Sequence, residues 1–524
     1  MKKVLLSFAI IFSLLLVAKT SSAQRYFDEI FTSTTATGPV VYGENYGVLT
    51  GAPALQPLVM DVYQPSGDTA QSRPLVIYFH TGSFLPLLIN GTATGDRHDS
   101  ATVEMCKQFA RRGYVSASMD YRLGWNPIGN TQDIRTGTLL LAVYRAIQDA
   151  KTCVRYFKMD AKVQGNTFKI DTNRIMLVGQ GSGGYVTLAY ASLDKAAEIQ
   201  LLKFIAAETD LTYGFVAGQP YVNQALWGGF DGLGGLPGFN QNNWPEYGNM
   251  VSTVVNMGGA IGDSTWLEAG DVPIVCFHVT NDPFAPYGNG NVIVPTTGQF
   301  VVYVSGSREV VRLSNELGNN DVFDIPYNDP YTTRANQINE GFEGLFPFIL
   351  PDPSIAIPGN PFHGQAGPWE WWDSSALQLV APAYGVPAAN VAVIYQNAFL
   401  TNPDASKAKA LNYIDSIQGY LAPRAVQAMQ LPGFISGVQT PDIFASDIKM
   451  FPNPAVTYFT LRLDDPKQKM KFVQLFDMSG KLVREIKDIN GSEVNITREG
   501  LSTGLYMVKI GMDKKVIQGK LLFE

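Results

Sequence analysis

The residues best suited to chemistry stand at 179–184, where the sequence reads Gly-Gln-Gly-Ser-Gly-Gly. An apolar run at 175–178 precedes them and a helix-like stretch at 186–193 follows. This order predicts a strand, a sharp turn and a helix, which points the first N–H groups of the helix at whatever lies beyond the sheet edge. A serine hydroxyl placed at such a turn is suited to nucleophilic attack on a carbonyl carbon.

The elements around this turn must hold it at the edge of a sheet. Apolar strands are expected at 58–63, 74–80, 113–122, 252–257, 273–279 and 322–325, and helices at 101–112, 139–157 and 306–316. Strands that alternate with helices predict a mostly parallel sheet covered on both faces. The sequence therefore belongs to the α/β class.

Three motifs resemble the carboxylesterase branch of the α/β-hydrolase superfamily. Asn-Arg, four apolar residues and the glycine-rich turn at 173–184 resemble its nucleophile elbow, which reads Gly-x-Ser-x-Gly-Gly. Asp-Tyr-Arg at 120–122 resembles the end of an esterase strand, and 80–84 resembles the loop that donates oxyanion-hole N–H groups. The resemblance implies an α/β-hydrolase domain over residues 24–430.

The elbow admits two registers. Aligned without gaps, the nucleophile column holds Gly181, and Ser182 falls in the following column. Sliding by one residue makes Ser182 the nucleophile, but then Gln180 replaces the first glycine of the motif. A glycine also relieves the strained, positive-φ conformation of the elbow residue, so the gapless register is favoured.

The resemblance also implies the partners of a nucleophile. Asp282 follows the strand at 273–279 in a segment similar to the motif that carries the family's acid, in which His278 is structural. The family's chain order then asks for a histidine beyond the acid, and His363 is the one that qualifies. In the oxyanion loop the resemblance points to Thr81 and Gly82, with the N–H of Ser182 as a further donor.

Two aromatic-rich segments, 213–247 and 341–372, have no clear period. Each is interpreted either as an aromatic wall over a pocket or as a packed surface excursion.

The end of the chain is expected to be a separate module. Segments at 451–455, 473–483, 501–510 and 519–524 alternate in the manner of strands joined by turns, which predicts a small β-sandwich. Their order resembles the type A C-terminal sorting domain of the type IX secretion system. The resemblance implies that residues 447–524 are recognised by the outer-membrane translocon, after a linker at 431–446.

The beginning of the chain resembles a secretory signal. Two lysines, an apolar run at 4–18 and small residues before Gln24 predict cleavage after Ala23. We therefore expect export to the periplasm and then secretion or display on the outer cell surface, without a transmembrane anchor in the mature protein.

Charge and composition restrict the classes of partner and cofactor that the chain is expected to bind. The chain has 39 Lys+Arg against 46 Asp+Glu, a net charge of −7, and no basic cluster in its main domain. This balance argues against nucleic acid as a partner. No spacing typical of metal ligands appears, and no cofactor is expected.

Two function classes remain. In the first, the chain is a binding protein that keeps an ester-recognising pocket but lacks a nucleophile, because Gly181 fills the nucleophile column. In the second, it is a serine hydrolase of carboxylic esters, small or polymeric, in which Ser182 attacks, His363 is the base and Asp282 orients the histidine.

Overall fold

The computed structural model describes residues 24–324, 327, 329–431, 448–463, 465–477, 481–512 and 516–524. The chain divides into two compact units, with the boundary after Leu431. The expected signal peptide and residues 432–446 of the expected linker lie outside the described residues.

An eight-stranded sheet forms the centre of the first unit, in the order β1-β2-β4-β3-β5-β6-β8-β11. From β4 to β11 all neighbours pair in parallel, whereas β2 is antiparallel to both β1 and β4. The predicted α/β-hydrolase fold class is therefore confirmed. The strands are β1 Thr34–Gly47, β2 Ala54–Pro65, β3 Arg73–Phe79, β4 Val115–Met119, β5 Ile170–Gln180, β6 Thr253–Met257, β8 Ile274–Val279 and β11 Leu345–Phe348.

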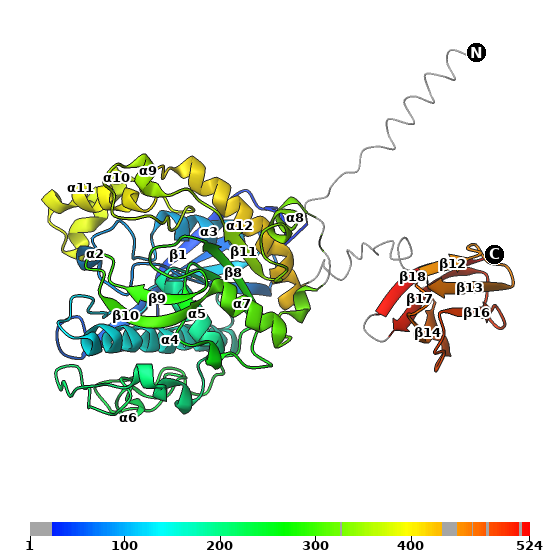
Figure 1. Cartoon of the computed structure of the whole chain (residues 1–524), viewed down its shortest axis with the longest axis horizontal. Helices are drawn as coiled ribbons and strands as arrows, with labels where there is room; N and C mark the ends of the chain where they lie inside the picture. The colour runs from blue at the N-terminus through cyan, green and yellow to red at the C-terminus, as the bar shows by residue number, and fades with distance from the viewer. Residues whose placement is uncertain are drawn as a thin grey trace, which may run out of the picture. The chain divides into compact units, whose positions relative to one another are not determined.

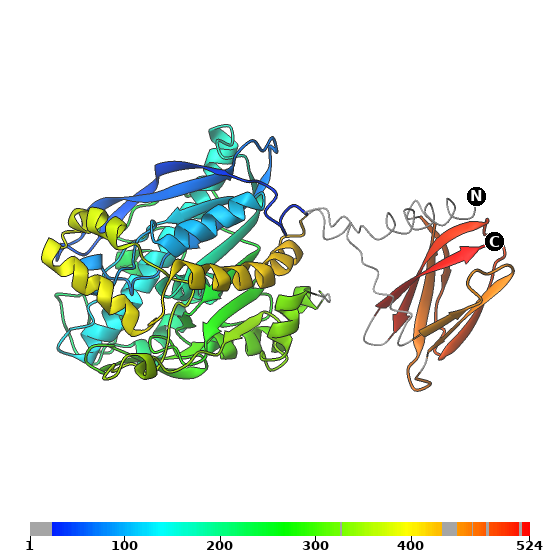
Figure 2. The same ribbon diagram turned by 90° about the horizontal axis from the view of Figure 1, so that it is seen from above.

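Helices cover both faces of this sheet. Figures 1 and 2 show α3 and α12 on one face and α4 and α5 on the other. No helix within the described ranges is long and apolar enough to cross a membrane. The helices are α2 Leu87–Asn90, α3 Ser100–Arg111, α4 Gln132–Val163, α5 Ser182–Ser192, α6 Gln224–Trp227, α7 Ser307–Glu316, α8 Pro330–Asn336, α9 Pro353–Ala356, α10 Ser374–Val380, α11 Ala388–Asn397 and α12 Lys407–Ala428.

The central strands are apolar because they face helices on both sides. Every residue of β3, β4, β6 and β8 is buried, as expected for parallel strands between two helical layers. A second, three-stranded sheet, β7-β10-β9, lies outside this layer and consists of β7 Ala260–Ile261, β9 Asn289–Ile293 and β10 Phe300–Gly306.

One expected strand is wrong. Residues 321–323 form the 3₁₀ helix η4, Asp321–Phe323, where a strand at 322–325 was expected, and residue 325 lies outside the described residues. The sheet is completed by β11, which pairs with β8 and places Pro347 opposite His278. A proline is tolerated there because β11 is an edge strand and one side of it needs no N–H donor.

The second unit consists of two antiparallel sheets, in the orders β12-β13-β16 and β15-β14-β17-β18. Their apolar faces share one core that includes Phe459, Leu461, Val473 and Val508. The expected small all-β module is therefore present. Its strands are β12 Ile448–Phe451, β13 Tyr458–Leu463, β14 Met470–Phe476, β15 Leu482–Ile486, β16 Glu493–Thr497, β17 Gly504–Met512 and β18 Val516–Phe523.

Candidate active site

Gly181 forms the turn between β5 and α5. Its φ is 52° and its ψ is −115°, a left-handed conformation that is strained for residues other than glycine. Its N–H donates to the carbonyl of Met257 on the neighbouring strand β6, at 2.8 Å. A Cβ at Gly183 would lie 2.3 Å from the carbonyl oxygen of Phe79, so a side chain there would force the helix away from β3.

The space beside Gly181 is filled by Thr81. A Cβ built on Gly181 would lie 2.1 Å from Thr81 Oγ1 and 3.0 Å from Thr81 Cβ. Non-bonded heavy atoms do not approach so closely, since their favourable separation is about 3.5–4.0 Å. The threonine side chain therefore occupies the place into which a nucleophile at position 181 would project.

Ser182 is the first residue of α5, and its side chain points into a hydrogen-bonded chain. Its Oγ lies 2.9 Å from Tyr121 Oη, which lies 2.8 Å from the carbonyl oxygen of His80. A carbonyl oxygen can only accept a hydrogen bond, so the Tyr121 hydroxyl donates to the main-chain carbonyl of His80. The Ser182 hydroxyl therefore donates to Tyr121 Oη. The serine residue is only 6% exposed.

The expected oxyanion loop passes beside this turn. Gly82 has a φ of 116°, and a Cβ there would lie 2.4 Å from Gly95 Cα. Glycine is therefore required at this position. The first N–H groups of α5, from Ser182 and Gly183, have no acceptor within the helix, as at any helix N-terminus, so they can act as donors to a carbonyl oxygen.

Asp282 lies in the loop after β8, where its side chain is 5% exposed. Its Oδ1 accepts from the N–H groups of Phe284 and Ala285, at 2.7 and 3.1 Å. Burial raises the pKa of this carboxyl to about 7, although both N–H donors favour the ionised form.

His278 is the imidazole nearest to this acid among the ion pairs of the described residues, with Nε2 3.9 Å from Asp282 Oδ2. Burial lowers the pKa of His278 to about 4, so the ring is neutral at neutral pH. Its Nδ1 lies 2.6 Å from Ser307 Oγ and its Nε2 lies 3.1 Å from the carbonyl oxygen of Ala285. These contacts engage both ring nitrogens, so His278 has a structural place.

His363 lies beside the acid loop, but its ring points elsewhere. The main-chain carbonyl of His363 accepts from Asn281 Nδ2 at 3.4 Å. Its side chain is 77% exposed, and Nδ1 pairs with Asp352 Oδ2 at 2.9 Å. No hydrogen bond of the described residues joins His363 to Asp282 or to Ser182. The structure therefore does not bring the three residues of the expected triad together.

Glu370 reaches the elbow from the loop between α9 and α10. Its carboxylate accepts a hydrogen bond from Gln180, the last residue of β5, and Gln180 accepts in turn from Tyr78 at 2.8 Å. Burial, with a smaller contribution from Asp282, raises the pKa of Glu370 to about 8. Sequence reasoning missed this residue, because no motif surrounds it.

Trp369 lies next to Glu370 in the same loop and is 2% exposed. A Cβ on Gly258 would lie 4.0 Å from its indole ring and 3.4 Å from Asp282 Oδ2. Gly258 directly follows the carbonyl that accepts from Gly181. The indole of Trp369 and the carboxyl group of Glu370 are thus both buried near the elbow and Asp282.

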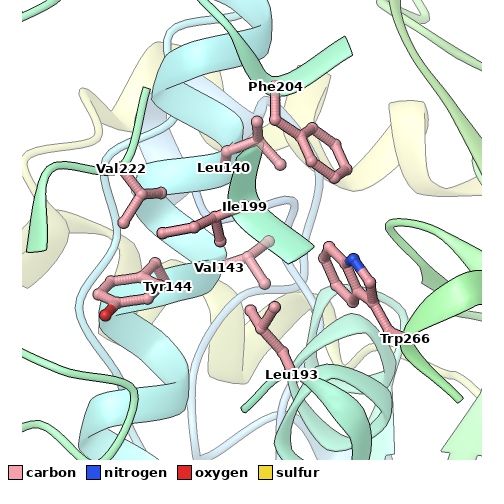
Figure 3. Close-up of a pocket in the computed structure, with 8 residues that line it drawn as sticks. All are labelled: Leu140, Val143, Tyr144, Leu193, Ile199, Phe204, Val222 and Trp266. Atoms are coloured by element: carbon pink, nitrogen blue, oxygen red, sulfur yellow. The ribbon is translucent and has the colours of Figure 1, made fainter. Parts of the chain in front are cut away.

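A separate small cavity lies on the α4 side of the sheet (Figure 3). Its volume is about 20 Å³, little more than the roughly 10–15 Å³ that one water needs. The side chains around it are almost wholly apolar, and none of the candidate site residues is among them. They are Leu140, Val143, Tyr144, Leu193, Ile199, Phe204, Val222 and Trp266.

Within the part of the chain that the structure describes, no group of three or more His, Cys, Asp or Glu side chains is placed to hold an ion. The three cysteines, Cys106, Cys153 and Cys276, are buried free thiols.

Comparison with known proteins gives matches at both ends of the chain. Residues 60–213 match the family model BD-FAE, and residues 449–524 match the model of the secretion system C-terminal sorting domain. No curated protein matches this chain.

Solved structures of esterase 2 from Thermogutta terrifontis are similar at low level. The form phosphorylated by paraoxon has 15% identity and a TM-score of 0.30, over 61% of this chain and 83% of that one. The propionate-bound form has 15% identity and a TM-score of 0.31, over 70% of this chain and 94% of that one.

The BD-FAE match spans β3, β4, the elbow and α5, which are the elements that carried the sequence motifs. The tail match covers all but the first residue of the strands in the second unit. The expected resemblance is confirmed in both parts: the first unit is similar to esterase-like α/β-hydrolase domains over residues 60–213, and the second unit matches the secretion system C-terminal sorting domain over residues 449–524.

Proposed function

We propose that this protein is exported through the type IX secretion system and binds an ester-bearing ligand at the elbow without hydrolysing it through a serine. The ligand is a small molecule or a polymer that carries carboxylic esters. The sorting tail supports export and a secreted or cell-surface location. The binding role is supported by the esterase-like elbow and its helix N-terminus.

The packing of Thr81 against Gly181 is the main support for a protein without a serine nucleophile. Gly181 has no side chain at the projecting position of the elbow, and Thr81 fills the space beside it. Ser182, the nearest serine, donates its proton to Tyr121 rather than to a base. A general base must lie within about 2.6–3.2 Å of the proton it removes, and the imidazole of His363 is paired with Asp352.

Ligand recognition without attack has a physical basis in the same residues. The N–H groups at the start of α5 can hold a carbonyl oxygen, as oxyanion-hole donors do. Near the same turn, Trp369 lies against Gly258 and Glu370 bonds to Gln180, and these residues offer an apolar face and a hydrogen-bonding group. The site therefore has the groups that binding of an ester requires. Acyl transfer also requires a nucleophile with a base beside it, and the site lacks that pair.

The test compares binding with turnover in the full-length chain. We expect p-nitrophenyl esters to change the tryptophan fluorescence of the wild type and to release p-nitrophenol no faster than in buffer. Trp369→Phe should lose part of the fluorescence change, whereas Trp266→Phe, which changes an indole at the separate cavity, should keep it. Ester hydrolysis that disappears in Ser182→Ala would instead support the active serine esterase.

A further inference from the structure

Arg145, on α4, is a buried arginine, and two of its guanidinium nitrogens have no hydrogen-bond partner within the described part of the chain. The residue is 1% exposed, and neither its Nε nor its Nη2 has a partner among the described residues. The ring of Trp227 lies over the guanidinium, with its centroid 5.2 Å from the guanidinium carbon, and the charge of Asp149 also favours the protonated form. Buried polar groups are nearly always hydrogen-bonded, so this site calls for an explanation.

The carboxylate of Asp149 attracts the charge of Arg145 through space, but its hydrogen bonds in the described part of the chain go to Arg122. Asp149 is fully buried, and its carboxylate accepts hydrogen bonds from the backbone N–H and the Nε of Arg122, both at 2.8 Å. Arg122 also donates to main-chain oxygens, including that of Arg145 itself. Two arginines thus share one carboxylate, and the buried cluster carries one uncompensated positive charge.

Loss of the proton does not remove this charge at neutral pH. Burial and the repulsion from Arg122 lower the pKa of Arg145 to about 9, so the group stays protonated at pH 7. Burying an ion without a full set of partners is strongly unfavourable, and the attraction of an aromatic face offsets only part of that cost. A counter-charge or a bound polar molecule must therefore reach the guanidinium.

The surroundings restrict what can bind. A Cβ on Gly124 would lie 2.7 Å from Arg145 Nη2 and 2.7 Å from Val48 Cγ2, so the chain closes tightly over this nitrogen. Trp227 closes another side. This enclosure favours a monatomic ion over phosphate or a carboxylic acid. We propose that Arg145 binds a small monovalent anion of chloride size, which neutralises the cluster beneath α6 and residues 122–125.

The first test measures thermal unfolding of the full-length chain in sodium chloride and in sodium gluconate at equal ionic strength. Because gluconate is too large for the site, the wild-type Tm should rise with chloride and not with gluconate. A tenfold excess of chloride over its Kd shifts the unfolding equilibrium about elevenfold. Arg145→Met should remove the chloride response, whereas Arg308→Met, at an exposed arginine paired with Glu340, should keep it.

The second test needs no variant. In wild-type crystals soaked in sodium bromide, an anomalous peak should appear within hydrogen-bond distance of the Arg145 guanidinium. Water alone at that position, with equal Tm values in both salts, would overturn the proposal. A chloride response that survives in Arg145→Met would also overturn it, because the ion would then act elsewhere.

Discussion

Thr81 Oγ1 lies 2.1 Å from the point that a Cβ on Gly181 would occupy. The two positions therefore cannot both carry a side chain in the present backbone. The residue at the elbow and the residue in the expected oxyanion loop form one unit, and any attempt to restore a nucleophile must change both.

The first prediction follows from this exclusion. Gly181→Ser should destabilise the protein by at least the roughly 1–3 kcal/mol that a non-glycine residue costs in this backbone conformation, and the clash with Thr81 adds to that cost. The double variant Thr81→Gly/Gly181→Ser should recover part of the loss, because the clash is gone. Urea unfolding of the wild type, both single variants and the double variant measures this. Equal stability of Gly181→Ser and the wild type would show that the space is free.

The second prediction concerns the buried chain from Ser182 to His80. Ser182→Ala should cost about 1 kcal/mol, the usual net value of one hydrogen bond. Tyr121→Phe should cost more, because it also leaves the buried His80 carbonyl without its donor.

A double-mutant cycle separates this structural role from a catalytic one. Ser182→Ala and Tyr121→Phe should be non-additive, with a coupling energy of at least about 0.5 kcal/mol. Additive effects would mean that the two hydroxyls do not bond.

The third prediction is a pH dependence that comes from Glu370 and Asp282. Burial holds their pKa values near 8 and 7 in the folded protein, above the usual range near 4 of an unfolded chain. At these two groups the folded state binds more protons than the unfolded state, so their contribution to stability is greatest below about pH 4 and is lost as pH rises through 7 and 8.

Thermal unfolding between pH 5 and pH 9 tests this sign. Glu370→Gln should flatten the fall in Tm, since the amide cannot ionise. The matched control is Glu340→Gln, at an exposed carboxylate whose pKa is lowered by its bond to Arg308, and it should not flatten the fall. A Tm that rises between pH 5 and pH 9 in the wild type would contradict the assignment.

Much of the scaffold could be predicted because it depends on local pattern. The apolar runs of β3 and β8 and the glycines around Gly181 follow from neighbours in sequence. Asp282 was predicted from the resemblance of its segment to a family motif, and the structure places it in the loop after β8. The strands can be predicted because apolar residues are buried, and the turn can be predicted because glycine readily adopts a positive φ.

The rest depends on contacts between distant residues. Glu370 meets Gln180 across 190 positions, and nothing near residue 370 marks it as a site residue. His363 was chosen by chain order, but the orientation of its ring depends on Asp352. The short strand β11 was missed because Phe-Pro-Phe within an aromatic-rich stretch does not resemble a strand until β8 offers a partner.

The fourth prediction concerns the sorting tail. Deletion of residues 447–524 should leave the protein in the periplasm, because the translocon would lose its recognition domain, while the α/β unit keeps its fold. Western blots of periplasm, cell surface and medium, with urea unfolding of the truncated protein, measure both parts. Full secretion of the truncated chain would contradict the sorting role.

We infer that no serine of this elbow is a nucleophile. A fluorophosphonate probe, which labels reactive serines, checks this on the purified full-length protein, with Ser182→Ala as the comparison and an active serine esterase as the positive control. We predict that neither the wild type nor Ser182→Ala is labelled while the control is. Labelling of the wild type that is lost in Ser182→Ala would contradict the account and identify Ser182 as the nucleophile.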